Sequence, residues 1–176
     1  GFLAEPAQLE HFLEDIFSAV PISISIKTRI GVAQPEEFAE LLDLYNQFPI
    51  TELIVHPRVQ KDLYNNKPNW EMFAYGVAHS KNPICYNGDL FCVDDYRRFC
   101  QTFPQVKTIM LGRGILKNPG LLDEIQQQKP LDKNMLLQFH DTILQGYQEA
   151  FSGEKPVLFK MKEIWSYMLS VFADGK

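Results

Sequence analysis

The sequence predicts an α/β protein in which the C-terminal half of a (β/α)8 TIM barrel is followed by part of an α-helical bundle domain. Four short apolar segments alternate with helical patterns up to residue 111, an order typical of parallel βαβ units. A parallel sheet needs helices on both faces or closure into a barrel, and four βα units make half of an eight-stranded barrel. After residue 114 only helical patterns remain.

A helix is expected over residues 5–19, ahead of the first strand. Its apolar side chains recur on one helical face, and Pro6 falls in the first turn, where proline is tolerated. Because no strand pattern precedes this helix, we expect the chain to be the C-terminal part of a longer protein whose first strands lie upstream.

The four expected strands are short apolar runs, and each runs into polar residues. They cover residues 22–26, 52–55, 84–86 and 108–111. Helices are expected between them, one starting at Pro35 and two more at 70–79 and 93–102. A polar loop rich in asparagine and proline occupies residues 57–69. This alternation predicts that all four strands run parallel.

In the last third of the chain the sequence pattern predicts only helices. A short helix is expected at 120–128, and residues 126–132 have the composition of a linker. Two apolar stripes at helical spacing follow, at 136–151 and 158–172, and they predict a helical hairpin from a small bundle. We therefore expect two domains, a partial barrel over residues 1–128 and the start of a helical domain over residues 129–176.

Composition limits the classes of function that the chain can serve. Hydrophobic residues make up 45% of the sequence, which is enough for a real core, and the net charge of −5 excludes a strongly basic surface that coats RNA. No apolar run reaches the roughly 18 residues of a membrane span. The three cysteines have no metal-ligand spacing, so we expect no metal site and a reducing, cytoplasmic setting.

Polar groups that can bind a ligand come directly after each expected strand. In a parallel barrel the active site lies at the C-terminal ends of the strands, so four such endings predict one shared site. The four endings are Lys27-Thr28-Arg29, His56-Pro57-Arg58, Asn87-Gly88-Asp89 and Gly112-Arg113-Gly114.

The chemistry of these side chains favours a ligand that carries a phosphate. Glycines let backbone N–H groups approach an anion, and Arg113 can clamp it with two hydrogen bonds. Asp89 either bonds ligand hydroxyls or caps the helix that follows. Lys27 would stabilise negative charge on a reduced flavin ring, and His56 would donate a hydrogen bond to a ring carbonyl or to a phosphate.

At these endings the sequence resembles the tRNA-dihydrouridine synthases, flavoenzymes that reduce uridines in tRNA. The segments that carry the resemblance are GFLAEP, ISIKTRIG, ELIVHPRVQKDLYNNKPNW, PICYNGDL and IMLGRGILKNPGLLDEI. The resemblance implies that FMN is the cofactor, with NADPH as reductant and tRNA as substrate. It implies FMN contacts at Lys27, His56, Asn87, Gly88, Asp89, Gly112 and Arg113. Arg29 and Arg58 would lie on the tRNA side, and the helical tail would begin a tRNA-binding domain.

The chain departs from the family pattern at the catalytic cysteine. In the family, reduced FMN gives a hydride to C6 of the uracil, and a cysteine protonates C5; this cysteine would lie before Gly1. None of the three cysteines matches its position: Cys85 falls in a strand, and we expect it to be a small buried hydrophobic residue, while Cys92 and Cys100 follow it. We therefore expect that no catalytic residue lies within the chain and that the chain alone is inactive.

Two alternatives remain open from the sequence. The first is another barrel oxidoreductase that binds FMN or a phosphate, although the helical tail and the loop at 57–69 argue against it. The second is a half-barrel that acts as an interaction module without catalysis. A half-barrel would expose two strand edges, so we also expect oligomerisation through these edges.

Overall fold

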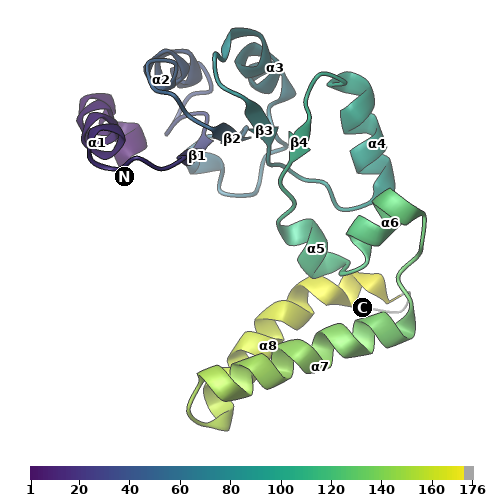
Figure 1. The fold of residues 1–176 in the computed structure, drawn as a ribbon. Helices are drawn as coiled ribbons and strands as arrows, with labels where there is room; N and C mark the ends of the chain where they lie inside the picture. The colour runs from purple at the N-terminus through teal and green to yellow at the C-terminus, as the bar shows by residue number, and fades with distance from the viewer. Residues whose placement is uncertain (173–176) are drawn as a thin grey trace. The chain divides into compact units, whose positions relative to one another are not determined.

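The computed structural model describes residues 1–172 (Figure 1). The chain forms two compact units. The first combines residues 1–88 with residues 102–110, and the second combines residues 89–101 with the chain from residue 111 onward. These divisions fall elsewhere than after residue 128, and the predicted boundary between a partial barrel and a helical domain stays a prediction.

The first unit contains a parallel sheet of four strands in the order β1-β2-β3-β4. The strands are β1 (Ser25–Arg29), β2 (Glu52–His56), β3 (Ile84–Tyr86) and β4 (Thr108–Ile109). All three neighbouring pairs are parallel, which confirms the predicted α/β class. β1 and β4 are the two outer strands of this sheet.

The bounds of three strands differ from the prediction, and the smallest difference is in β2, which runs one residue further, to His56. The first strand was expected over residues 22–26 but forms over Ser25–Arg29, so Lys27 lies in the middle of β1 and not after it. Pairing with β2 sets this register, because Ser25 lies opposite Glu52 and the ladder runs on from there, while Ile22 stays 68% exposed. β4 ends at Ile109, two residues early, although the Met110 N–H still donates to the Tyr86 carbonyl at 2.8 Å.

The three long helices of the first unit agree with the sequence pattern. They are α1 (Pro6–Ala19), α2 (Glu37–Tyr45) and α3 (Trp70–His79). Asn69 caps α3 by accepting a hydrogen bond from the Met72 N–H at 3.0 Å. α2 and α3 lie on the same side of the sheet and contact each other (Figure 1). Two short 3₁₀ helices, Phe2–Ala4 and Gln60–Asp62, complete the unit.

Aromatic rings fill the core between α3 and the sheet. The ring of Phe73 is fully buried and meets the ring of Tyr86 edge to face, with centroids 4.9 Å apart. Phe103 packs edge to face against Phe73 at 5.2 Å and against Trp70 at 5.6 Å. Such pairs add about 0.5–1.5 kcal/mol each to area burial, so they fix the position of β3 against α3.

The second unit is helical. Its helices are α4 (Val93–Thr102), α5 (Arg113–Lys117), α6 (Leu121–Gln127), α7 (Lys133–Ala150) and α8 (Glu154–Met168), followed by a 3₁₀ turn at Leu169–Val171. α7 and α8 lie side by side as the predicted hairpin, and α8 also contacts α5 (Figure 1). α5 was not predicted, because residues 112–114 were expected to form a turn. No helix within residues 1–172 is both long enough and apolar enough to span a bilayer.

Candidate functional site

The sheet of the first unit has two faces with different chemistry. Thr28 points to the helical side, where its hydroxyl lies 3.0 Å from the Tyr45 hydroxyl of α2. Neighbouring residues of a strand point to opposite faces, so Lys27 and Arg29 point the other way. In the ladder Lys27 lies opposite Ile54 and Arg29 opposite His56, which places these side chains on the face away from α2.

The ammonium group of Lys27 is partly desolvated in spite of its open position. The residue as a whole is exposed, yet the protein atoms that surround its charged end lower its pKa below the ordinary value of 10.5. The positive charge of Arg29 lowers the pKa further. Partial loss of hydration destabilises the charged form of this lysine, and an anionic ligand beside it would stabilise that charge.

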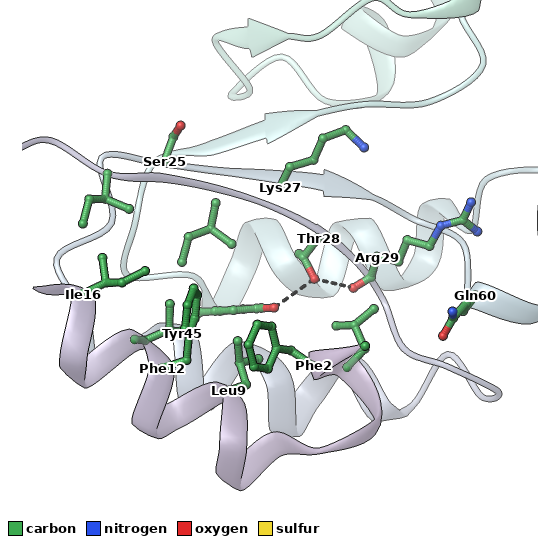
Figure 2. A pocket seen from close by; sticks show the side chains of 15 residues that line it. Phe2, Leu9, Phe12, Ile16, Ser25, Lys27, Thr28, Arg29, Tyr45 and Gln60 are labelled. Atoms are coloured by element: carbon green, nitrogen blue, oxygen red, sulfur yellow. Dashed lines mark hydrogen bonds between the residues drawn. The ribbon is translucent and has the colours of Figure 1, made fainter.

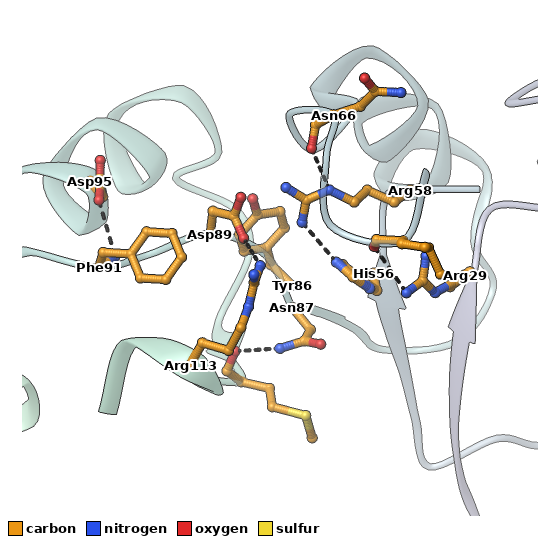
Figure 3. Close-up of polar contacts among 12 residues, drawn as sticks. Arg29, His56, Arg58, Asn66, Tyr86, Asn87, Asp89, Phe91, Asp95 and Arg113 are labelled. Atoms are coloured by element: carbon orange, nitrogen blue, oxygen red, sulfur yellow. Dashed lines mark hydrogen bonds and ion pairs between the residues drawn. The ribbon is translucent and has the colours of Figure 1, made fainter. Parts of the chain in front are cut away.

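His56 and Arg58 form a buried pair at the end of β2. Their exposed fractions are 7% and 1%, and an Nη1 hydrogen of Arg58 points to Nε2 of His56 across 3.1 Å (Figure 3). Arg58 also donates from Nε to the Asn66 carbonyl at 2.6 Å. Residues two apart at the end of a strand share a face, and this spacing is the sequence signal that would have found the pair.

Arg29 is bonded to the same loop. It donates to the Val59 carbonyl at 2.8 Å and to the Leu63 carbonyl at 3.2 Å, and its guanidinium lies 5.7 Å from the ring centroid of Tyr64. Leu63 has a φ of 50°, an uncommon conformation for a leucine, so the loop needs such contacts to keep its shape. Arg29 and Arg58 were predicted to lie on the tRNA side, which stays a prediction; in the structure both shape the loop at 57–69.

The Asn87-Gly88 turn is held by contacts within the first unit. The side-chain amide of Asn87 donates to the Met110 carbonyl at 2.9 Å, and its backbone N–H donates to the Val55 carbonyl at 2.9 Å. Gly88 lies directly against the Tyr86 side chain, and a Cβ at this position would overlap the phenol ring and its hydroxyl. The glycine is therefore required by packing, a reason that the sequence did not reveal.

Trp70 supports this turn from α3. Its indole N–H donates to the Tyr86 hydroxyl at 3.0 Å, and this bond fixes the outer end of the ring that lies beneath Gly88. Tyr86 was not among the predicted site residues. A strand that ends in tyrosine directly before an Asn-Gly turn is the only sequence signal for this arrangement.

In the second unit, Asp89 and Arg113 form an ion pair. Their closest atoms are 2.6 Å apart, and the two side chains are 25% and 28% exposed (Figure 3). The Arg113 guanidinium also lies 5.6 Å from the centroid of the Phe91 ring. These contacts orient Arg113 while leaving part of it open to solvent, as a residue that binds an anion requires.

The two glycines beside Arg113 differ in their surroundings. A Cβ on Gly114 would overlap the Leu90 carbonyl, so this glycine allows α5 to pack closely. A Cβ on Gly112 would have no atom within 4 Å, so the space beside it is open. An open backbone next to a fixed arginine is the arrangement that a phosphate needs.

The predicted FMN contacts fall into two groups. Within the first unit Lys27 lies in the middle of β1, His56 is the last residue of β2, and the Asn87-Gly88 turn directly follows β3. Within the second it brings Asp89 and Arg113 together and places Gly112 next to Arg113. The roles of all seven residues stay predictions.

A separate cavity of about 610 Å³ lies between α1 and β1, within the first unit. Most of its lining is apolar, from residues such as Phe12 and Ile16 of α1, and the Thr28–Tyr45 hydrogen bond lies at its wall (Figure 2). Lys27 and Arg29 are the predicted site residues that also line it.

Comparison with known proteins identifies the family. The sequence profile described as dihydrouridine synthase matches residues 1–172. The chain is 29% identical to a tRNA-dihydrouridine(16) synthase of Pseudomonas putida over 143 residues, which cover 80% of this chain and 44% of that protein. It is 28% identical to a tRNA-dihydrouridine(47) synthase [NAD(P)(+)]-like protein of Xenopus tropicalis, covering 75% and 21%.

A third relative, a tRNA-dihydrouridine(16) synthase of Aquipseudomonas alcaligenes, is 30% identical over 70% of this chain and 39% of its own length. The chain thus spans less than half the length of these curated relatives. The profile nevertheless covers all but the last four residues. The chain belongs to the dihydrouridine synthase family.

Proposed function

We propose that the chain is the cofactor-holding part of a tRNA-dihydrouridine synthase, an enzyme that reduces a uridine of tRNA to 5,6-dihydrouridine. The observation that carries the proposal is the family match over residues 1–172. The relatives are named for positions 16 and 47 of tRNA, so the proposal covers a uridine of tRNA without choosing between positions.

The residues present fit FMN as the cofactor. The cation of Lys27 lies on the same sheet face as Ile54 and Cys85, which are 7% and 3% exposed and offer an apolar floor to a planar ring. Arg113 offers a fork of donors beside the open backbone of Gly112. The chain thus offers an apolar surface for the flavin ring, a cation beside it and hydrogen-bond donors for the phosphate.

Each of these residues has a defined part in the proposal. FMN, when bound and reduced by NADPH, supplies the hydride that the uracil ring accepts. Lys27 stabilises negative charge at the ring, and His56 donates a hydrogen bond to the cofactor. Asn87 and Asp89 orient the ribityl chain, with Gly88 shaping their turn, and Arg113 with Gly112 binds the phosphate. The barrel that closes around these residues is part of the same proposal.

The proton donor of the reaction is not one of the three cysteines of this chain. Cys85 lies inside β3, where burial raises the pKa of its thiol, so the thiol is a weaker proton donor than an ordinary cysteine. Cys92 precedes α4 and Cys100 lies within it, and neither directly follows a strand along the chain. We therefore expect the 176-residue chain alone to be inactive, and the full-length protein to stay active when all three cysteines are replaced by serine or alanine.

The helical unit supplies the proposed contact with tRNA. The α7–α8 hairpin exposes Leu158 and Phe159, at 65% and 62%, and α8 carries Lys155, Lys160 and Lys162. Lysines bind the phosphate backbone, as an RNA-binding helix requires. A cytoplasmic location belongs to the same proposal, because tRNA is modified there.

The experiment uses the full-length protein, purified tRNA without dihydrouridine, and NADPH. We expect bound FMN in the purified protein and formation of dihydrouridine at one mapped position. Lys27→Ala should lower both FMN content and product, while Lys81→Ala, an exposed lysine beyond the C-terminus of α3, should leave both unchanged. Reduction of small alkenes without any reaction on tRNA would point to another flavin oxidoreductase.

A further inference from the structure

We propose that Arg58 is a positioning residue that holds His56 as the neutral tautomer with its proton on Nδ1. This inference rests on the proposed function, in which His56 donates a hydrogen bond to the cofactor. It adds a role for a buried arginine that has so far been assigned only to the tRNA side.

The first step is burial. Arg58 is 1% exposed, and an arginine is rarely so deep unless its donors are satisfied by fixed partners. Its Nε bonds the Asn66 carbonyl at 2.6 Å, and its backbone N–H bonds the His56 carbonyl at 2.7 Å. The guanidinium plane is therefore fixed relative to the end of β2.

The second step is donor chemistry. The Nη1 atom of Arg58 lies 3.1 Å from Nε2 of His56. A guanidinium group has five N–H donors and no acceptor, and it stays charged in proteins, so Nε2 must be the acceptor. An imidazole nitrogen accepts only when it carries no proton, and a neutral ring then carries its one proton on Nδ1.

The third step concerns geometry at the site. His56 is the last residue of β2, and its ring is 6.2 Å from the ring of Tyr64 in the loop that both arginines hold. With Nε2 accepting from Arg58, the N–H donor of the neutral ring is Nδ1. Arg58 thereby determines which nitrogen of His56 can donate to the cofactor.

Lysine cannot replace Arg58 in this role. An ammonium group is a compact charge on a flexible stem, whereas the guanidinium fork reaches the Asn66 carbonyl and the His56 ring from two different nitrogens. Arg29 provides a matched control, because it holds the same loop through Val59 and Leu63. An Arg29→Lys change loosens the loop without removing the partner of Nε2.

The experiment is ¹⁵N NMR of the full-length protein with labelled histidine, without FMN. The chain contributes four histidines, and His56→Gln identifies the signals of the ring in question. We expect a protonated-type shift at Nδ1 and an unprotonated-type shift at Nε2. Arg58→Lys and Arg58→Met should lose this pattern, and Arg29→Lys should keep it.

A second measurement, FMN affinity, links the tautomer to the proposed function. Loss of the bond to Nε2 should weaken FMN binding about tenfold, the effect of one hydrogen bond of ordinary strength. Wild-type protein with the proton on Nε2, or an Arg58→Met variant with an unchanged pattern, overturns the inference. If Arg58 fixes the tautomer but the protein does not bind FMN, the proposed function fails while the positioning role stands.

Discussion

At the scale of single residues, Gly88 shows that a glycine predicted to contact a ligand can also be required by packing. A turn of sequence Asn-Gly-Asp suggests a backbone that must approach an anion. In the structure the glycine is needed because the Tyr86 side chain lies directly beneath it, bonded in turn to Trp70. The same contact places Asn87 where it bonds the Met110 carbonyl.

Replacing Gly88 by alanine tests this packing. The added Cβ overlaps the Tyr86 ring as well as its hydroxyl, so we expect a loss of about 1–3 kcal/mol in the free energy of unfolding. Denaturant titration measures it. Gly146→Ala, in open space within α7, should instead stabilise the protein by up to about 1 kcal/mol. Combining Gly88→Ala with Tyr86→Phe should not restore stability; full restoration would show that the ring itself has room.

We expect the partly desolvated charge of Lys27 to lower the free energy of unfolding. Desolvation lowers its pKa, so between that lowered value and 10.5 the unfolded chain binds more protons than the folded chain. Stability contributed by this group therefore rises with pH across that window. We expect Lys27→Met to raise the melting temperature at neutral pH, with an advantage that shrinks as the pH approaches 10.5. A melting temperature that falls at neutral pH would contradict the desolvation of Lys27.

Arg113→Lys tests the role of the guanidinium fork at the proposed phosphate site. Lysine keeps the charge but not the paired donors, so we expect FMN to bind about tenfold to hundredfold more weakly, measured by fluorescence quenching. Arg97→Lys, an exposed residue of α4 paired with Asp94, should have no effect. Equal affinity in both variants would remove Arg113 from the site.

At the scale of elements, the turn before α2 shows how a single carboxylate can organise a connection. Glu37 accepts hydrogen bonds from the backbone N–H groups of Val32, Ala33 and Gln34, at 2.7, 3.0 and 2.7 Å. Gly31, with a φ of 149°, has no room for a Cβ between this carboxylate and the Gln34 carbonyl. The turn joins β1, which carries Lys27 and Arg29, to α2.

Glu37→Gln should therefore destabilise the protein by about 1.5 kcal/mol or more at neutral pH, because glutamine offers one neutral acceptor oxygen where the carboxylate offers two charged ones. The bonds to Val32 and its neighbours lower the pKa of Glu37 below 4.5. Stability from this group is present above pH 4.5 and is lost as the pH falls through the lowered folded value. Thermal melts from pH 7 to pH 3 should show the variant and wild type converging. A difference that persists at pH 3 would mean that charge is not the cause.

Among the elements, the β1 boundary was the clearest error of the sequence pattern. Alternating isoleucines at 22, 24 and 26 suggested the strand, yet pairing with β2 begins only at Ser25. Helices were better predicted, since α3 and α4 match to the residue. A helix closes its own hydrogen bonds, whereas the limits of a strand depend on a partner elsewhere in the chain.

At the scale of the whole molecule, the outer position of β1 in the sheet is the feature with the largest consequence. β1 is an outer strand of the parallel sheet, and an outer strand carries backbone N–H and C=O groups that a further strand can pair with. The cavity of about 610 Å³ beside it is lined mainly by apolar side chains. An outer strand next to apolar surface favours association.

We therefore expect the 176-residue chain, prepared alone, to form oligomers at micromolar concentration. Light scattering coupled to size exclusion measures the mass, and the oligomers should weaken when Ile26 in β1 is changed to lysine. Ile22→Lys, at an exposed position outside the strand, is the control and should change little. A monodisperse monomer would contradict this expectation and the half-barrel proposal behind it.

The sequence by itself determined the parallel α/β class, the alternation of four strands with helices and the polar residues that follow β2 and β3. Local patterns suffice for these, because side-chain periodicity and turn composition follow from the geometry of each element. Only the tertiary structure placed Arg58 against His56, Tyr86 beneath Gly88 and Arg113 beside Asp89. The register between strands and the packing of side chains decide which groups meet, and no single segment contains that information.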